Sequence, residues 1–328
     1  MGVSADIGLR CEACAALRIP HDRFCEACGT RVGAEPTEED GFTRDCHGCG
    51  APASAIDADG YCSVCGVREQ PPPARIEIDL AVAAAVSDQG RRRRRNEDAF
   101  HLERYDDGVV AVVCDGVGTS ASADLAAQSA ARVAGTVLVE AARSGSTTPA
   151  AMSAEAVHAA QASVCALPAQ GEPSCTLVSA LVRAHDFVIA SVGDSRAYWI
   201  APRDARQLTV DDSWMGEQLA AGHDAAQSAA DPRAQSITRW IGADAPDGLP
   251  QLVTVEPVVD GRLVLCTDGL WNYIPGAAEL AQLLDGVGSA ASAATAARAL
   301  TDIALSRGGH DNITVAVVDV RPQRRSLE

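Results

Sequence analysis

Four aspartates stand at the ends of apolar runs, in an arrangement that suits a hard metal ion. Three follow runs that are typical of buried strands and the fourth directly precedes one; in chain order they are Asp115, Asp194, Asp268 and Asp311. Strands from distant parts of a chain bring their ends together when they pack, so these carboxylates can converge. Mg²⁺ and Mn²⁺ prefer oxygen ligands in near-octahedral geometry. The pattern therefore predicts a divalent-cation site.

A run of five arginines, Arg91 to Arg95, directly precedes Asn96, Glu97 and Asp98. Such a run is usually a solvated face or an anion-binding patch. A planar guanidinium can also bind a phosphate through two parallel hydrogen bonds. An isolated Asp-Gly pair is typical of a turn, and Gly193 to Arg196 alone could form a hairpin turn. Only the joint order of these motifs indicates a catalytic site.

Together, the motifs resemble those of the metal-dependent serine/threonine protein phosphatases, the PPM or protein phosphatase type 2C family. The motifs that carry the resemblance are Arg91–Ala99, Cys114–Gly116, Gly193–Arg196, Cys266–Gly269 and Asp311–Asn312. The resemblance extends from Asp79 to Val320. It implies hydrolysis of phosphoserine and phosphothreonine in proteins by a hydroxide that bridges metal ions.

The resemblance also implies a set of metal ligands. Asp115 would bridge two Mn²⁺ or Mg²⁺ ions, and the carbonyl of Gly116 would bind one of them. Asp268 and Asp311 would bind the other ion. Asp194 matches the position that helps to hold a third, weaker ion in bacterial members. Two or three ions are therefore expected.

Three catalytic residues follow from the same resemblance. Glu97 and Asp98 would hold metal-bound waters in place, and Arg93 would bind the substrate phosphate. Because Arg93 is singled out only by its spacing from Glu97, its neighbours in the arginine run remain alternatives.

The chain departs from the family pattern in two segments. Val117 to Ser120 stands where many members have Met-Gly-Gly or His-Gly-Gly-His. The acid that protonates the leaving oxygen is therefore unassigned, with a metal-bound water and His310 as candidates. Leu208 to Gly242 resembles the mobile flap of the family, with Asp231 where a histidine is usual. This variation leaves the choice of substrate open.

The predicted secondary structure can position these residues. Continuous apolar runs predict strands at Leu80–Val86, Ala99–Arg104, Val109–Val113, Ser174–Arg183, Phe187–Val192, Ala197–Ala201, Val253–Glu256, Leu263–Cys266 and Ile313–Val320. Alanine-rich stretches predict helices at Ala121–Ala142, Ala150–Ala166, Ala277–Leu284 and Ala290–Leu305. The strands between Ser174 and Ala201 are expected to form one meander. Helix pairs between strand runs predict an α+β fold, an αββα sandwich of two central sheets flanked by helices.

Eight of the twelve cysteines lie in four Cys-x-x-Cys pairs near the N-terminus: Cys11 and Cys14, Cys25 and Cys28, Cys46 and Cys49, and Cys62 and Cys65. Two such pairs complete a tetrahedral sulfur site for Zn²⁺. Pairing by proximity predicts two structural zinc ions in a double zinc ribbon, although crossed pairing of the units stays open. Disulfides or a thioredoxin-like redox pair explain four pairs less well.

These features predict a divided chain. We expect a zinc ribbon at residues 1–33, an acidic linker at 34–45, a second ribbon at 46–68, a Pro-rich linker at 69–78 and a phosphatase domain at 79–321. The linker contains Pro71 to Pro73, a stiff extended spacer. The ribbons are predicted to recruit a protein partner or to regulate the site, with a purely structural role as the alternative.

Composition narrows the function further. All 27 basic residues are arginine. The net charge is −17, and this acidic balance disfavours nucleic acid and anionic membranes as partners. Membrane-spanning and signal segments are not expected, which predicts a cytoplasmic protein with reduced cysteines, in a bacterial setting. The favoured function is a protein phosphatase that acts on phosphorylated proteins and opposes a Ser/Thr kinase. The alternative is a catalytically silent phosphatase-like binding protein.

Overall fold

The computed structural model describes residues 49–52, 55, 61–67, 74–106, 108–117, 122–145, 147–167, 172–245, 249–288 and 291–322. The predicted first ribbon, the acidic linker and Cys46 lie outside the described residues. For the elements that were predicted, the observed bounds differ mainly by a few residues at the ends.

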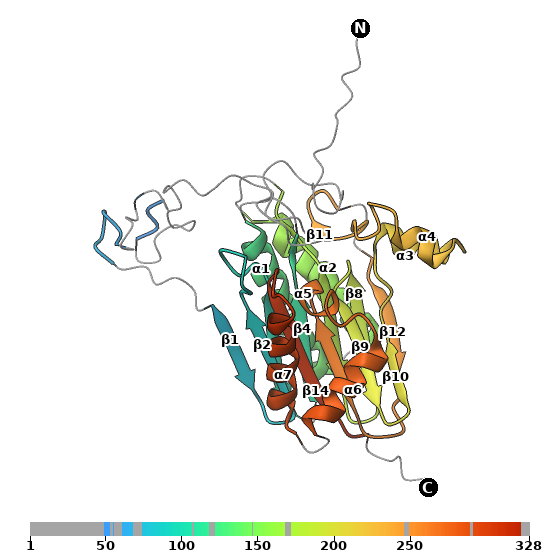
Figure 1. The fold of residues 1–328 in the computed structure, drawn as a ribbon. Coiled ribbons are helices and arrows are strands. Elements are labelled where there is room, and N and C mark those ends of the chain that lie inside the picture. Colours follow the sequence, from blue (N-terminus) through green and yellow to red (C-terminus); the bar gives the residue numbers. More distant parts are fainter. Residues whose placement is uncertain are drawn as a thin grey trace.

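Two antiparallel sheets pack face to face at the centre of the molecule (Figure 1). The six-stranded sheet has the order β1 (Arg75–Asp79), β2 (Ala83–Asp88), β14 (Ile313–Val320), β13 (Gly261–Cys266), β9 (Arg196–Ala201) and β10 (Asp204–Gln207). The five-stranded sheet has the order β12 (Gln251–Val255), β8 (Phe187–Val192), β7 (Leu177–Val182), β4 (Gly108–Cys114) and β3 (Ala99–Tyr105). A small sheet of β11 (Ile241–Gly242), β6 (Ser174–Cys175) and β5 (Gly116–Val117) lies beside them.

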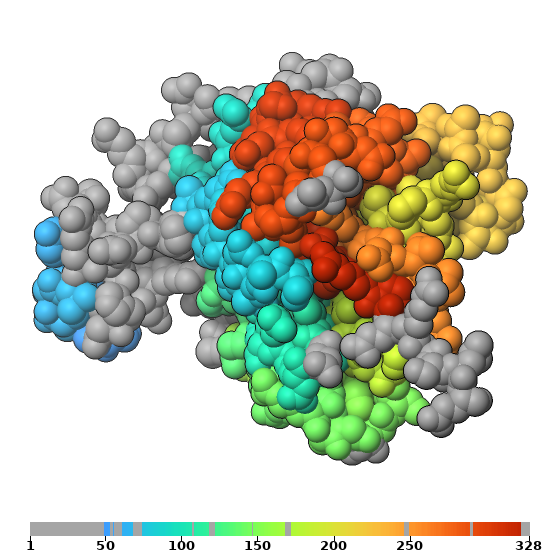
Figure 2. Space-filling model, turned by 90° about the horizontal axis from the view of Figure 1, so that it is seen from below, coloured from blue at the N-terminus to red at the C-terminus, as the bar shows by residue number. Residues whose placement is uncertain are grey.

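Helices cover the outer face of each sheet. α1 (Ala123–Ser144) and α2 (Pro149–Cys165) pack on the five-stranded sheet, where alanines of α1 meet side chains such as Val112 and Leu181. α5 (Asp268–Trp271), α6 (Ala277–Val287) and α7 (Ala293–Ser306) pack on the six-stranded sheet. Seen end-on, the orange C-terminal helices lie on one side and green segments on the other (Figure 2). The αββα sandwich predicted from the sequence is therefore the observed architecture.

The core between the sheets explains why the central strands are continuously apolar. Side chains from both sheets form one buried cluster that includes Val113, Ile189, Leu265 and Val318. The other faces of the same strands pack on the helices, so β4, β7 and β8 are buried along their whole length. Strands that are covered on both faces are expected to lack polar alternation.

The prediction of one meander between Ser174 and Ala201 was wrong. β7 and β8 pair in the five-stranded sheet, whereas β9 pairs with β13 and β10 in the other sheet. The chain changes sheets at Gly193 to Ser195. Gly193 has a φ of +99°, and a Cβ there would lie 2.7 Å from Thr176 Cγ2, so the crossing favours glycine.

The sheet also begins before the predicted boundary at Asp79. Residues 75–78, predicted to end the linker, form β1 together with Asp79 and pair with β2. The strand was missed because it is an exposed edge strand in which charges alternate with isoleucines. Two ion pairs attach it to α7: Arg75 with Asp302 at 2.8 Å and Glu77 with Arg298 at 2.6 Å.

Candidate active site

The sequence-predicted acidic residues meet at one end of the sandwich. Asp115 follows β4, and Asp268 begins α5 just after β13. β14 runs antiparallel to β13, with Val315 opposite Cys266, so Asp311 reaches the same end. β3 begins opposite the end of β4, with Ala99 paired to Cys114, which brings Glu97 and Asp98 there as well.

Asp194 joins this group because of the crossing between the sheets. Its backbone carbonyl accepts a hydrogen bond from Trp271 Nε1 at 2.9 Å, so α5 fixes the crossing from the side of Asp268. Ser195 and Thr176 share a buried hydroxyl hydrogen bond of 2.7 Å, and the Thr176 hydroxyl lies 3.2 Å from the backbone nitrogen of Asp115, which donates to it. The turn at Asp194 and the end of β4 are thus held in one network.

Asp115 lies at the electrostatic centre of the group. Burial raises the pKa of its carboxyl well above the ordinary value, and the charges of Asp98, Asp268, Asp311 and Asp194 raise it further, in that order. Five carboxylates therefore repel one another at this end of the sandwich, four of them half-buried and Asp98 buried. Such an arrangement is unfavourable unless protons or cations balance the charge.

Asp98 is a buried carboxylate of this group, with 6% of its surface exposed. Its Oδ2 accepts a hydrogen bond from the Thr267 hydroxyl at 2.9 Å, and that hydroxyl in turn accepts from the backbone of Thr314 at 3.0 Å. Within the described part of the chain, Oδ1 of Asp98 has no hydrogen-bond partner. Burial raises the pKa of Asp98 to about 7, and the charge of Asp311 contributes to the rise.

Arginines of the run bring positive charge to the same site. Arg93 Nη2 lies 2.6 Å from Asp311 Oδ2, and Arg95 Nε lies 3.1 Å from Glu97 Oε1. The pKa of Glu97 is nevertheless raised, because burial outweighs the attraction of Arg95 and Arg93. Arg93 is thus joined directly to Asp311, a predicted ligand of the ions.

Asn312 is a structural residue of the site to which the sequence analysis gave no role. It is 3% exposed, and its Nδ2 donates to the carbonyls of Gln89 at 2.8 Å and Arg95 at 2.9 Å. Its Oδ1 accepts from the backbone of Glu97 at 2.8 Å. One side chain thus holds both ends of the arginine run. Its place directly after Asp311 was the available signal, since the pair was part of a recognised motif.

The carboxylates fit divalent cations in their chemistry, although they do not form a compact cage. No three His, Cys, Asp or Glu residues of this end, among the residues described, bring one donor atom each within 4.8 Å of one another. Asp311 is instead oriented by Arg93. Hard oxygen donors, mutual repulsion around Asp115 and the unpartnered Oδ1 of Asp98 are the features that suit Mg²⁺ or Mn²⁺.

His310 lies at the rim of the site. Its ring stands edge-on to that of Tyr273 with centroids 6.0 Å apart, and its backbone nitrogen donates to the Tyr273 hydroxyl. Burial and then the charge of Arg92 lower the pKa of His310. The histidine is close to the carboxylates in sequence and in space, but no contact assigns it a role.

The segment Leu208 to Gly242 is attached to the site at its two ends. Asp212 accepts hydrogen bonds from the backbone of Gly193 at 3.0 Å and from Arg239 at 3.2 Å. Arg196 donates to both carboxylate oxygens of Asp211. Between these anchors, α3 (Trp214–Ala220) and α4 (Ala225–Ala229) project from the sandwich (Figure 1).

Three cysteines of the predicted second ribbon lie together. The sulfurs of Cys49, Cys62 and Cys65 are all within 4.8 Å of one another, and Cys49 and Cys62 are 3.7 Å apart. Gly50 and Gly66, which follow two of these cysteines, both have a φ of +72°. The other predicted zinc ligands lie outside the described residues: Cys11, Cys14, Cys25, Cys28 and Cys46.

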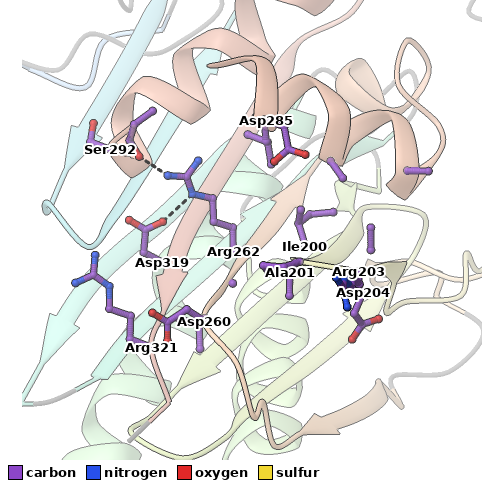
Figure 3. A pocket seen from close by; sticks show the side chains of 18 of the residues that line it. Ile200, Ala201, Arg203, Asp204, Asp260, Arg262, Asp285, Ser292, Asp319 and Arg321 are labelled. Carbon is purple, nitrogen blue, oxygen red and sulfur yellow. Dashed lines mark hydrogen bonds and ion pairs between the residues drawn. The ribbon is translucent and has the colours of Figure 1, made fainter. Parts of the chain in front are cut away.

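A pocket of about 790 Å³ opens at the other end of the sandwich, near the start of β13 and the end of β14. Arg262 points across it to Asp319, at 2.9 Å, while Arg203, Asp260 and Arg321 lie on its rim (Figure 3). The predicted phosphatase residues Arg93, Glu97, Asp98, Asp115, Gly116, Asp194, Asp268 and Asp311 are not among those that line it.

A sequence model of the family described as protein phosphatase 2C matches residues 89–303, more than half of the chain. The chain belongs to the protein phosphatase 2C family. A relative is the serine/threonine phosphatase stp of Listeria welshimeri, 31% identical over 247 residues, which cover 71% of this chain and 93% of the relative. This chain is a protein serine/threonine phosphatase.

Solved structures of serine/threonine phosphatases share the fold. The Mycobacterium tuberculosis phosphatase PstP/Ppp is 26% identical, with a TM-score of 0.63 over 73% of this chain and 98% of that one. The catalytic domain of PstP in complex with two manganese ions is 24% identical, with a TM-score of 0.60 over 75% and 100% of the two chains. Among the described residues, no helix has the length and hydropathy that a membrane crossing needs.

Proposed function

We propose that this phosphatase hydrolyses phosphoserine and phosphothreonine in proteins with two Mn²⁺ or Mg²⁺ ions. Asp115 and the Gly116 carbonyl, together with Asp268 and Asp311, would hold the pair. The observation that carries this proposal is the meeting of these carboxylates at one end of the sandwich, where the ends of β4, β13, β14 and β3 lie together. Asp194 would take part in a third, weaker site. The manganese ions in the related PstP structure agree with this choice of metal.

When bound, the ions would activate a water and neutralise charge on the phosphoryl group. The chain's own residues supply orientation. Arg93, already directed to this end by Asp311, would hold the phosphate through its guanidinium. Asp98, fixed by Thr267, and Glu97, fixed through its backbone by Asn312, would orient water molecules around the reacting group. The candidates for the acid that protonates the leaving oxygen are still a water and His310.

The test is hydrolysis of a phosphothreonine peptide with added Mn²⁺, with Asp268→Asn as the variant. Asp285→Asn is a matched control, because Asp285 is an exposed aspartate at the other end of the sandwich. We expect turnover that needs Mn²⁺ and is lost in Asp268→Asn alone. Calorimetric titration of Mn²⁺ adds a second readout, and unchanged Mn²⁺ affinity in Asp268→Asn would contradict the ligand assignment.

We also propose that Cys46, Cys49, Cys62 and Cys65 bind one structural zinc, and that the four preceding cysteines bind another. The support is the clustering of three sulfurs, with a positive φ at two following glycines, which suits metal knuckles. Zinc content per chain should fall by one in Cys65→Ser. It should not change in Cys165→Ser, which removes an exposed cysteine of α2. Equal zinc content in both variants would argue against the site.

The cysteine segment is proposed to recruit a protein partner for a phosphatase that opposes a Ser/Thr kinase. Removal of residues 1–74 stops just before β1, so the sandwich is preserved. Hydrolysis of a small aryl phosphate should then continue at the wild-type rate, while action on the physiological phosphoprotein weakens. A large change in the small-substrate rate would point to direct regulation of the site instead.

A further inference from the structure

The arginine run is a fixed loop at the edge of the site. The backbone nitrogen of Arg91 donates to the Gly309 carbonyl at 2.7 Å, and Gln89 Nε2 donates to the carbonyl of Arg93 at 2.8 Å. Asn312 donates to the carbonyl of Arg95 at 2.9 Å. The start, middle and end of the run are thus each held by a hydrogen bond to buried or half-buried structure. We call residues Arg91 to Arg95 the arginine loop.

Four of the five side chains of this loop divide into two groups. Arg93 and Arg95 turn to the carboxylate cluster and pair with Asp311 and Glu97, as described above. Arg91 and Arg94 are exposed to solvent, and Arg91 Nε donates to the Leu305 carbonyl at 3.0 Å. The loop therefore places positive charge both at the carboxylate cluster and on the surface beside it.

This concentration of positive charge is unusual for the chain. The net charge is −17, and five of the 27 arginines stand in one run. A local patch of opposite sign on an acidic protein attracts short anionic segments, while the surrounding charge repels extended polyanions. A rigid loop also loses little conformational entropy when it binds.

We propose that Arg91 and Arg94 form an anion-docking surface for acidic groups that flank the phosphorylated residue of the substrate. This inference rests on the proposed function, since it assumes that the phosphoresidue enters between Arg93 and the carboxylates. An extended peptide advances about 3.3–3.6 Å per residue, so side chains two to four residues away lie about 7–14 Å from the phosphate. Arg91 and Arg94 lie two residues and one residue from Arg93 in the same fixed loop. The docked groups are carboxylates or a second phosphate.

The test compares three phosphothreonine peptides that share one length and differ in their flanks: neutral, glutamate-rich, or carrying a second phosphothreonine. The enzyme is the full chain with Mn²⁺. For the wild type, we expect kcat/KM on the acidic flanks to exceed that on the neutral flank by about 5- to 20-fold, because several charge pairs contribute. The ratio should fall as salt rises from 50 to about 300 mM, since exposed charges are screened.

In Arg91→Gln/Arg94→Gln, the ratio of acidic to neutral flanks should fall to about twofold or less, because both exposed charges are gone. The control is Arg104→Gln/Arg206→Gln, which removes two exposed arginines from β3 and β10. Arg104 is five residues along β3 from Ala99, or about 17 Å from the site end. This control should keep the wild-type ratio.

The two arms of the test identify the source of the anion. A preference for the doubly phosphorylated peptide alone assigns the surface to a second phosphate, and a preference for both acidic peptides assigns it to negative charge in general. Equal hydrolysis of all three peptides by the wild type overturns the docking proposal but leaves the proposed function intact. Failure to hydrolyse any of them refutes the proposed function itself. Competition by a short single-stranded oligonucleotide at the concentration of the acidic peptide would overturn the assignment to a protein substrate.

Discussion

Replacement of Asn312 by alanine should loosen the arginine loop and lower the stability of the whole domain. The side chain makes three hydrogen bonds to backbone groups of residues 89, 95 and 97, and it is almost completely buried. Water cannot readily replace these bonds. The loop that carries Arg93 would therefore lose the contact that holds both of its ends.

The size of the effect follows from the contacts. Each hydrogen bond contributes about 0.5–1.5 kcal/mol net, so the loss of three amounts to about 3 kcal/mol in the free energy of unfolding. For a domain of this size, that lowers Tm by about 6–12 °C. Asn312→Asp should cost at least as much, because it keeps the acceptor for the Glu97 backbone but turns a carboxylate towards two carbonyls.

Urea and thermal unfolding of both variants provide the measurement, with Asn272→Ala as the control. Asn272 is exposed and its side chain makes one hydrogen bond, to Asp268 at 3.2 Å, so its loss should cost less than about 0.5 kcal/mol. The reasoning is refuted if Asn312→Ala unfolds within 1 kcal/mol of the wild type, since the loop would then be held by its other contacts.

Three further predictions test the core and the charge of the site. Asp98→Asn removes a buried carboxylate whose pKa is raised to about 7. The variant should therefore have a higher melting temperature than the wild type in EDTA, yet hydrolyse less phosphopeptide. A lower melting temperature in EDTA would contradict this. Gly269→Ala would place a Cβ 1.9 Å from the Asn312 carbonyl oxygen, so it should lower the free energy of unfolding by more than about 3 kcal/mol or prevent folding. Its control, Gly286→Ala, has open space in α6 and should raise that free energy by up to about 1 kcal/mol. Similar stability of the two variants would contradict the packing described. Burial lowers the pKa of His101 below 6.5, so the unfolded state binds more protons than the folded state. The free energy of unfolding should therefore fall as pH drops from 7.5 to 5.5, and it should fall less steeply in His101→Gln. Parallel pH curves for variant and wild type would contradict this.

The sequence predicted best those elements whose signal is local. β8 and β14 have the predicted bounds, because each is a continuous apolar run buried on both faces. The bounds of the helices deviate by a few residues, since alanine-rich ends give little indication of a cap. β1 was not predicted because an edge strand needs no apolar run. Its residues form ion pairs with α7, which lies more than 200 residues away in the sequence.

The sequence was less informative about partners in space. Nothing local to Phe187–Ala201 says that β8 and β9 belong to different sheets, because the pairing of β9 depends on β13. The convergence of the aspartates was foreseen from their order and from the family resemblance. The pairing of Arg93 with Asp311 and the three contacts of Asn312 were not foreseen. They depend on the angle at which two loops meet that lie more than 200 residues apart in the sequence.

The position of β14 has a consequence for the synthesis of this enzyme. It lies between β2 and β13, so the six-stranded sheet has a gap at its centre until residues 313–320 are present. A ribosome delivers these residues after every other strand of the domain, and they arrive together with Asp311 and Asn312. Because domains generally fold as units, the nascent chain should stay open until this last strand inserts. The same insertion completes the acidic cluster, so a partly made chain would be unable to remove phosphate from proteins near the ribosome.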